Sequence, residues 1–190
     1  MYIVGASTLG EIACSVIKRG AERLDGFFDD YYSDNVGFCG APVIGKLDKI
    51  FKMDAVKQAG VFVAIGDNLN RRLISERITA AGIPLVNIID PTAVLEEDVV
   101  LGAGNMIMSH VYIGVKTIMG NGNIVFPGVS ITHHNKIGCY NFFSPNTSVG
   151  GYTEIANECK VGMNCCVLPY NKIASHAHSL PCTVLGEINE

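Results

Sequence analysis

The sequence predicts a small α/β domain followed by a long parallel β-helix. Three observations predict this order: an apolar residue recurs at every sixth position from Ile89 to Ile173, strand-like and helix-like segments alternate before it, and a glycine-containing loop joins the first strand to the first helix. A period of six fits neither an α-helix, at 3.6 residues per turn, nor a strand, at two. It is typical of a parallel β-helix, in which the chain turns a corner after every sixth residue.

The apolar series has fifteen members in one unbroken phase, which we call the anchors. They are Ile89, Leu95, Leu101, Ile107, Ile113, Met119, Val125, Ile131, Ile137, Phe143, Val149, Ile155, Val161, Val167 and Ile173. Three six-residue units make one triangular coil of eighteen residues, so the segment holds about five coils. Residues eighteen apart should stack, and this predicts an internal ladder of Asn105, Asn123 and Asn141 whose amides satisfy one another's hydrogen bonds.

The first 88 residues predict a different architecture. Strands are expected at 2–4, 26–28, 43–44, 60–66 and 84–88, with helices after the first strand, near 47–59 and after residue 66. Alternation of strand and helix is typical of a parallel sheet covered by helices. We therefore expect a Rossmann-like domain at 1–88, a β-helix at 89–178 and an irregular tail at 179–190.

Composition and charge exclude several functional classes. The net charge is −4 without a basic stripe, so nucleic-acid binding is not expected. No apolar run reaches the roughly eighteen residues that a membrane span needs, and the segment MYIVGAS lacks the charged region of a signal peptide. Seven cysteines without metal-type spacing are typical of reduced thiols in a cytoplasmic protein. The neighbours Cys165 and Cys166 should point to opposite faces of their strand.

A glycine-containing loop follows the first expected strand. Gly5 and Gly10 bracket it, and Ser7 lies between them, directly before the first expected helix. Free N–H groups at a helix N-terminus suit a phosphate, and Asp29 and Asp30 follow about twenty residues later, where an acid can bind a ribose hydroxyl. Two interpretations stay open: a nucleotide-binding loop, or glycines that only make a tight turn, since Ser7 replaces the middle glycine of the dinucleotide fingerprint.

Two adjacent histidines, His133 and His134, lie two and three places after the anchor Ile131. Both positions are mostly polar in the other six-residue units, so both side chains are expected to face outward. An exposed imidazole can take a proton from an attacking amine or hydroxyl at neutral pH. Position alone also allows a pair of ordinary surface histidines, and it slightly favours His134, whose position is the more uniformly polar.

Five segments, taken in order, carry a family resemblance. They are residues 2–7, the strand end at 28–30, the segment 62–68 that ends in Asn68, the six-residue units, and residues 162–169. The chain resembles the sialic acid O-acetyltransferase and bacillosamine-pathway N-acetyltransferase family of left-handed β-helix (hexapeptide-repeat) sugar acyltransferases. The resemblance implies a left-handed β-helix, acetyl-CoA bound along it, a nucleotide sugar bound on the N-terminal domain with Asn68 among its contacts, and a homotrimer with active sites between neighbouring β-helices.

The same resemblance implies roles for three residues of the β-helix. In the family the base is a histidine followed by an acid, two further residues and Ile-Gly; this pattern puts His133 at the base position and His134 at the acid position. Gly151 matches the glycine whose N–H stabilises the oxyanion, and it follows His133 by eighteen residues, so the two should be close. The implied reaction is direct transfer of an acetyl group from acetyl-CoA to an amino or hydroxyl group of a nucleotide-linked or sialic-type sugar, without a metal.

The chain also departs from the family pattern. His134 replaces the acid and cannot supply a negative charge, Phe142 replaces a second histidine, and a Gly-x-Pro-Ala-Lys type ending is absent. These departures leave a second hypothesis open, a non-catalytic homologue that binds a nucleotide sugar and has weakened or lost acyl transfer. A metalloenzyme is the third hypothesis, and His110 speaks against it because it lies 24 residues before His134 and does not stack with it.

Overall fold

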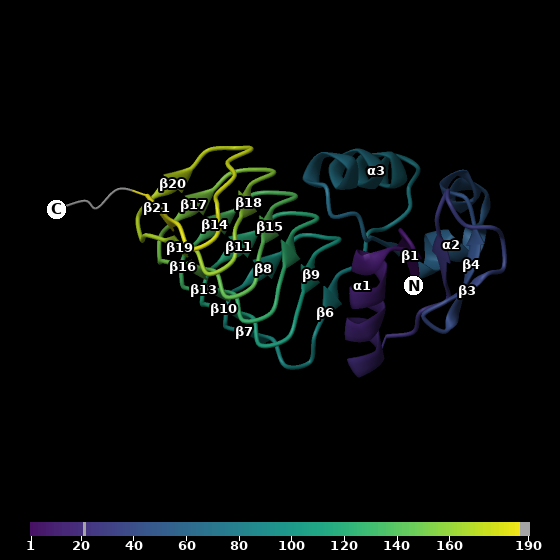
Figure 1. Ribbon diagram of the computed structural model, residues 1–190, viewed down its shortest axis with the longest axis horizontal. Helices are drawn as coiled ribbons and strands as arrows, with labels where there is room; N and C mark the ends of the chain where they lie inside the picture. Colours follow the sequence, from purple (N-terminus) through teal and green to yellow (C-terminus); the bar gives the residue numbers. More distant parts are fainter. Residues whose placement is uncertain (21, 187–190) are drawn as a thin grey trace.

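The computed structural model of the protein describes residues 1–20 and 22–186. Two parts lie end to end along its long axis: an α/β domain that contains the N-terminus, and a stack of coils that ends near the C-terminus (Figure 1). The predicted order, a Rossmann-like domain followed by a parallel β-helix, is confirmed. Residues 187–190, the end of the expected tail, lie outside the described residues.

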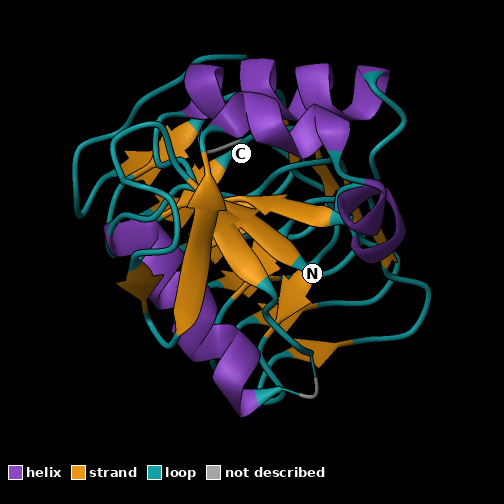
Figure 2. Ribbon diagram, turned by 90° about the vertical axis from the view of Figure 1, so that its right-hand side faces the viewer, coloured by secondary structure: helices purple, strands orange, loops and turns teal. Residues whose placement is uncertain are grey.

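The N-terminal sheet has the strand order β3-β4-β2-β1-β5. Its strands are β1 (Tyr2–Val4), β2 (Gly26–Phe28), β3 (Gly37–Phe38), β4 (Ala41–Gly45) and β5 (Val61–Val63). Strands β4, β2, β1 and β5 are parallel, in the order of one half of a dinucleotide-binding fold. The helices α1 (Thr8–Arg19), η1 (Leu47–Lys52, a 3-10 helix), α2 (Asp54–Ala59) and α3 (Asn68–Ala80) lie around this sheet (Figure 2).

Three local features of this domain differ from the sequence-based expectation. Strand β3 pairs antiparallel with β4 in a hairpin that the sequence pattern did not predict. The helix expected near 47–59 is broken at Met53, whose extended backbone separates η1 from α2. The strand expected at 84–88 is reduced to a single bridge between Val61 and Leu85, because the chain leaves the sheet there to begin the first coil.

Helix α1 links the cores of the two parts. Leu9, Ala13 and Val16 recur at helical spacing, so they lie on one face of the helix, and all three are buried. They belong to one cluster with Phe27 of the sheet and Met106 of the β-helix. Full burial of a large apolar side chain contributes about 1.5–3 kcal/mol. The sheet and the coils therefore share a continuous core on this side.

The β-helix consists of two-residue strands, of which β6 to β20 each end at an anchor and β21 ends at Leu185. They are β6 (Ile88–Ile89), β7 (Val94–Leu95), β8 (Val100–Leu101), β9 (Met106–Ile107), β10 (Tyr112–Ile113), β11 (Ile118–Met119), β12 (Ile124–Val125), β13 (Ser130–Ile131), β14 (Lys136–Ile137), β15 (Phe142–Phe143), β16 (Ser148–Val149), β17 (Glu154–Ile155), β18 (Lys160–Val161), β19 (Cys166–Val167), β20 (Lys172–Ile173) and β21 (Val184–Leu185). They form three parallel ladders, β7-β10-β13-β16-β19-β21, β8-β11-β14-β17-β20 and β6-β9-β12-β15-β18. Cys165 is buried and Cys166 is exposed, as expected for neighbours on a strand.

From the anchor Leu95 onward, each corner of the β-helix uses a left-handed backbone conformation. The residue three places after the anchor has a positive φ, for example 59° at His134 and 56° at Tyr152, and glycine takes this position at Gly104, Gly122 and Gly128. This conformation costs roughly 1–2 kcal/mol for a residue with a Cβ. Stacking of identical corners compensates, because each corner N–H can bond the coil before it, as His134 does with the Val115 carbonyl at 2.9 Å.

The predicted stacking of Asn105, Asn123 and Asn141 is confirmed, but their amides satisfy one another only in part, because Nδ2 of Asn141 has no partner among the described residues. The Asn105 side-chain oxygen accepts from the Asn123 backbone N–H at 2.8 Å, and the Asn123 oxygen accepts from the Asn141 N–H at 2.9 Å. The ladder extends one coil further in each direction than predicted, to Asn87 before it and Cys159 after it. All three predicted members are fully buried, so the side chains connect the coils through the interior.

The coils continue into the segment expected to be an irregular tail. Strand β21 pairs with β19, and Leu185 lies opposite Val167. The sixfold phase is intact there, since Leu185 follows Ile173 by two units, but the anchor position between them is Ser179. The last coil was not predicted because a serine replaces the apolar residue at this position. The Ser179 hydroxyl accepts a hydrogen bond from the Gly162 N–H at 2.9 Å in place of an apolar contact.

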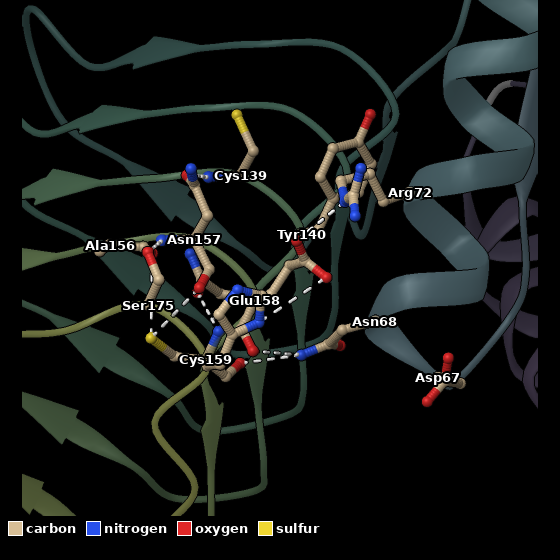
Figure 3. Close-up of polar contacts among 12 residues, drawn as sticks. Asp67, Asn68, Arg72, Cys139, Tyr140, Ala156, Asn157, Glu158, Cys159 and Ser175 are labelled. Atoms are coloured by element: carbon tan, nitrogen blue, oxygen red, sulfur yellow. Dashed lines mark hydrogen bonds and ion pairs between the residues drawn. The ribbon is translucent and has the colours of Figure 1, made fainter.

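Helix α3 is fixed to one corner of the β-helix by its polar side chains. Arg71 is fully buried and donates to carbonyl oxygens on both sides of the contact, including Gly122 at 2.8 Å and Tyr140 at 2.9 Å. Burial lowers the pKa of Arg71 to about 10. Asn68 and Arg72 point from α3 toward Glu158 (Figure 3): the Asn68 amide donates to the Glu158 carbonyl at 3.1 Å, and Arg72 pairs with the Glu158 carboxylate at 2.8 Å.

Candidate functional site

His133 and His134 lie together on the corner between β13 and β14. Their Nδ1 atoms are 3.2 Å apart, a hydrogen-bonding distance, and the rings are nearly perpendicular, at 84°. His133 is exposed and His134 is half-buried, so both face outward as predicted. Since Nδ1 of His133 bonds to its neighbour, the Nε2 atom is the one that faces away without a partner among the described residues. The pair is thus open to a reacting molecule at His133 Nε2.

Gly151 lies directly beneath the His133 ring. A Cβ added at Gly151 would lie 2.5 Å from Cε1 and 2.9 Å from Nε2 of His133. The closeness expected from the eighteen-residue spacing is therefore present, and only glycine leaves room for the ring at this position. Within the described ranges the Gly151 N–H donates to no protein acceptor, whereas the Tyr152 N–H bonds the His133 carbonyl at 3.2 Å. The exposed imidazole of His133 therefore covers the buried Gly151, whose N–H has no protein acceptor in the described part of the chain.

An aromatic stack continues from His134 along the corner. The His134 and Tyr152 rings are stacked at 4.7 Å with an interplanar angle of 20°, and the Tyr152 and Tyr170 rings at 5.2 Å with 5°. The sequence analysis missed both tyrosines. The signal was available, because His134, Tyr152 and Tyr170 are eighteen residues apart and occupy the same position in successive coils.

A shallow groove of about 550 Å³ lies on the face formed by β11, β14, β17 and β20. Small residues line part of it at successive coils, namely Gly138, Ala156 and Ala174. The charged rim is a ladder in which Glu154 pairs with Lys136 at 3.4 Å and with Lys172 at 3.0 Å. These contacts lower the pKa of the Glu154 carboxyl, Lys172 contributing most. The groove begins one unit after His133, so an extended molecule could lie along it and reach the histidine corner.

The loop between β1 and α1 is shaped by its glycines. Gly5 has φ +102°, and an added Cβ would lie 2.8 Å from the Ala64 carbonyl oxygen. A Cβ on Gly10 would collide with the Gly5 carbonyl oxygen. The tight strand-to-helix turn therefore requires both glycines, whether or not a nucleotide binds. Ser7, the N-cap residue of α1, is exposed and its side chain makes no capping hydrogen bond, so its hydroxyl is available to a ligand.

Asp29 and Asp30 hold the neighbouring loops. One Asp29 oxygen accepts from the Ala6 N–H and the other from the Tyr31 N–H, each at 2.8 Å. Asp30 accepts from the Leu47 N–H at 2.9 Å. Asp29 thereby joins the β1–α1 loop to the end of β2, which brings the predicted residues of this region together.

Two hollows flank Asp29. One, of about 460 Å³, is lined by Ser7, Thr8, Glu11, Tyr32 and Phe38 among others. The second, of about 280 Å³, lies between Asp30 and apolar side chains that include Ile65, which follows β5, and Ile74 of α3. Tyr31 lines both hollows and is 97% exposed, which is unusual for a ring of this size. The sequence analysis missed Tyr31 and Tyr32, which follow the predicted acids directly.

Asn68 does not lie with the loop residues. Its amide nitrogen donates to the Glu158 and Cys159 carbonyls, both at 3.1 Å, and its oxygen accepts from Arg71 at 2.7 Å. The side chain is thus occupied in the contact between α3 and the coils. The predicted residues form two separate groups in one chain, the histidine corner with Gly151 and the loop group with Asp29.

The other histidines lie away from this corner. His110 is exposed at a different corner, and His176 and His178 border a hollow of about 300 Å³ near the N-terminus of α3. His176 Nδ1 is 4.0 Å from the Glu158 carboxylate. In the part of the chain that the structure describes, no three His, Cys, Asp or Glu side chains are grouped as metal ligands. Within the same ranges, every helix is too short or too polar to serve as a transmembrane segment.

Comparison with known proteins gives the same architecture. Residues 1–78 match the family model of the PglD N-terminal domain. PerB from Caulobacter crescentus, whose structure contains CoA and GDP-perosamine, has a TM-score of 0.89 at 24% identity, over 97% of this chain and 87% of PerB. The acetyltransferase domain of PglB from Neisseria gonorrhoeae FA1090, in complex with acetyl coenzyme A, has a TM-score of 0.87 at 22% identity, over 97% and 91%. This chain has their fold. The resemblance found in the sequence is confirmed by the family model at the N-terminus and by the fold along the whole chain.

Proposed function

We propose that the protein transfers an acetyl group from acetyl-CoA to an amino or hydroxyl group of a nucleotide-linked or sialic-type sugar. The observation that carries the proposal is the position of the exposed His133 ring against the backbone of Gly151, whose N–H has no acceptor among the described residues. A base beside a free N–H donor is the arrangement that acyl transfer needs. The known proteins that share the fold, including one solved with a nucleotide sugar, support this choice.

The reaction follows from that geometry. The sugar amine or hydroxyl attacks the thioester carbonyl carbon, and His133 Nε2 accepts the proton that the nucleophile loses. The Gly151 N–H donates to the oxyanion of the tetrahedral intermediate. When the carbon–sulfur bond breaks, the proton on His133 can pass to the departing thiolate, so the products are the acetylated sugar and free CoA. His133 then returns to its starting state.

The face of the β-helix next to His133 supports the binding of the donor. An extended chain such as the pantetheine arm of CoA fits a groove whose floor has small residues, here Gly138, Ala156 and Ala174. The lysines on its rim, Lys136 and Lys172, can attract the phosphates of CoA. We place the thioester at the end of the groove that adjoins the histidine corner.

The loop group supports the binding of the acceptor. The first turn of α1 offers free N–H groups and an unused Ser7 hydroxyl to the phosphates, and the exposed Tyr31 offers an aromatic face to a base or a sugar. Asp29 and Asp30 stay in the proposed site, although each already accepts a backbone N–H. We leave Asn68 out, because its amide is occupied in the contact of α3 with the coils.

A homotrimer would bring together the histidine corner and the loop group that contains Asp29. In such a trimer the loop group of one subunit could face the histidine corner of the next. Exposed apolar side chains on the outer faces of the early coils support such an interface. They are Val94, Val100, Tyr112 and Ile118, between 37% and 56% exposed. Sedimentation velocity measures the state directly, and a monomer at assay concentration would contradict the trimer. Seven free thiols support a cytoplasmic location.

The test is a panel of nucleotide sugars, amino sugars included, incubated with acetyl-CoA and followed by release of the free thiol. We expect release with at least one sugar, and we expect His133→Ala to abolish it while leaving the unfolding temperature unchanged, because the side chain is exposed. Transfer that continues in His133→Ala would contradict the assigned base.

The replacement of the usual acid by His134 keeps one alternative in view, a homologue that binds a nucleotide sugar without acyl transfer. Calorimetry separates the two functions. Binding of a nucleotide sugar together with no detectable binding of acetyl-CoA would favour the non-catalytic protein. Micromolar binding of both ligands would favour the transferase.

A further inference from the structure

We propose that His134 and Tyr152 are positioning residues that hold His133 in the tautomer that a general base requires. The inference rests on the acyl transfer proposed above and concerns the same corner of the β-helix. It assigns a function to the imidazole at the acid position and to a tyrosine one coil further along.

The distance between the two Nδ1 atoms, 3.2 Å, allows one hydrogen bond and one proton between them. If His133 Nδ1 carries the proton, His134 Nδ1 accepts it, and His133 Nε2 keeps a free lone pair. If His134 Nδ1 carries the proton, a neutral His133 must be protonated on Nε2 and cannot act as a base there. Catalysis therefore requires the first arrangement, with His133 as donor and His134 as acceptor.

His134 can accept this bond only if its ring is held edge-on to His133. Two features hold it. The His134 backbone is fixed in the left-handed conformation by the bond to the Val115 carbonyl. The ring is stacked on Tyr152, which in turn is stacked on Tyr170 with nearly parallel planes. The stack fixes the side-chain rotation that brings Nδ1 of His134 to Nδ1 of His133.

Tyr152 contacts both histidines and so sets their mutual angle. Its ring is stacked on His134 at 20° and meets His133 edge to face at 80°, with centroids 5.4 Å apart. Aromatic contacts of this kind favour one ring orientation over another by several-fold.

The same pair stabilises the protonated base. When His133 Nε2 accepts a proton from the attacking group, the Nδ1–H bond to His134 becomes charge-assisted and stronger. A carboxylate at this position would do more, because it would add an opposite charge. The histidine pair thus orients the base without placing a fixed negative charge beside the thioester.

The test compares substitutions that suit the left-handed backbone at His134. Asn keeps a side-chain acceptor and tolerates φ 59°, as Asn146 does at the corresponding position of another unit. Gly also fits this backbone and removes the acceptor. We expect His134→Gly to lower kcat about 100-fold with little change in KM, and His134→Asn to stay within about tenfold of the wild type. Equal kcat values for the two variants would overturn the proposal.

A matched pair at Tyr152 tests the stack. Tyr152→Phe keeps the ring and should keep kcat. Tyr152→Asn suits the backbone, as at Asn146, but removes the ring and should lower kcat about tenfold. If both variants retain full kcat, the tyrosine does not position the pair.

The tautomer is measured independently of turnover by the ¹⁵N shifts of His133 at neutral pH in the free protein. We expect a protonated Nδ1 in the wild type and in His134→Asn, and a mixture of both tautomers in His134→Gly. A wild type protonated on Nε2 would overturn the proposal. If no sugar is acetylated but the shifts are as expected, the proposed function fails while the arrangement of the pair stands.

Discussion

The Arg71 guanidinium and the Gly122 carbonyl join the two domains across a buried contact. Nε of Arg71 donates to the Gly122 oxygen at 2.8 Å, and the two residues are 51 positions apart in the sequence. No carboxylate accepts from the Arg71 side chain within the described residues. Backbone carbonyl oxygens and the side-chain oxygen of Asn68 accept the hydrogen bonds of the guanidinium instead. The contact therefore depends on how α3 is placed against the coils.

Arg71→Leu should destabilise the protein by about 3–5 kcal/mol, because it leaves several buried carbonyl oxygens without donors. Urea unfolding of the purified protein measures this loss. Lys57→Gln is the control on α2, since Lys57 forms an exposed pair with Asp54 and its loss should cost less than about 1 kcal/mol. Equal stability of the two variants would mean that α3 is not fixed by Arg71.

Gly151→Ala should separate catalysis from folding. The new Cβ would collide with the His133 ring, which is the end of an exposed side chain and can swing away at little energetic cost. We expect an unchanged unfolding temperature and a loss of kcat of about 100-fold, since the base is displaced. Gly37→Ala, where an added Cβ meets no atom within 4 Å, is the control. Full activity in Gly151→Ala would show that Gly151 is not part of the catalytic site.

Asp90 should make the contact between α1 and the first coil sensitive to acid. Burial alone raises the pKa of the Asp90 carboxyl, but hydrogen bonds from Thr92 and Arg19 outweigh it and lower the pKa. The folded pKa is therefore below the unfolded value of about 3.9. The contribution of the ionised Asp90 carboxylate to the free energy of unfolding is therefore complete above about pH 4. This contribution is lost as the pH falls through the pKa of Asp90 in the folded protein.

The corresponding variant is Asp90→Asn, which should cost about 1–3 kcal/mol at neutral pH and progressively less below about pH 3. Unfolding by urea at several pH values gives the comparison. The exposed Asp98→Asn should cost little at any of them. A difference between Asp90→Asn and the wild type that stays constant into acid would rule out this linkage.

The asparagine ladder should carry part of the stability of the coils. Asn123→Ala removes the acceptor of the Asn141 N–H and the donor to the Gly120 and Gly138 carbonyls. We expect a loss of about 2–4 kcal/mol, since these groups stay buried. Asn164→Gly at an exposed corner suits the left-handed backbone and should change stability by less than about 1 kcal/mol. Thermal unfolding of both variants compares a buried with an exposed asparagine.

The sequence predicted those parts of the structure that depend on the local repeat. The sixfold phase identified every strand from β6 to β20 and, through the eighteen-residue spacing, the contacts of Asn123 and the closeness of His133 to Gly151. Stacking makes long-range neighbours predictable from position alone, because each coil repeats the one before it.

Contacts between the two domains could not be predicted in this way. Arginine is seldom fully buried, and the full burial of Arg71 depends on coils that lie 51 to 70 residues further along the sequence. Asn68 belongs to the same contact. The family resemblance implied that it binds the nucleotide sugar, whereas in the structure its side chain bonds the coils and Arg71. Ser179 hid the last coil because a hydrogen bond replaces an apolar anchor there.

The left-handed corners have a consequence for how this surface can change. Many units present an exposed side chain from the same left-handed backbone geometry, and histidine, tyrosine, lysine, asparagine and aspartate occupy such positions in this chain. The backbone conformation is shared by these positions, so an exchange at an exposed one alters the chemistry of the surface without a new backbone shape. His134, Tyr152 and Tyr170 thus occupy equivalent positions one coil apart. A functional side chain could be moved by substitution from one of these positions to the next along the axis of the β-helix.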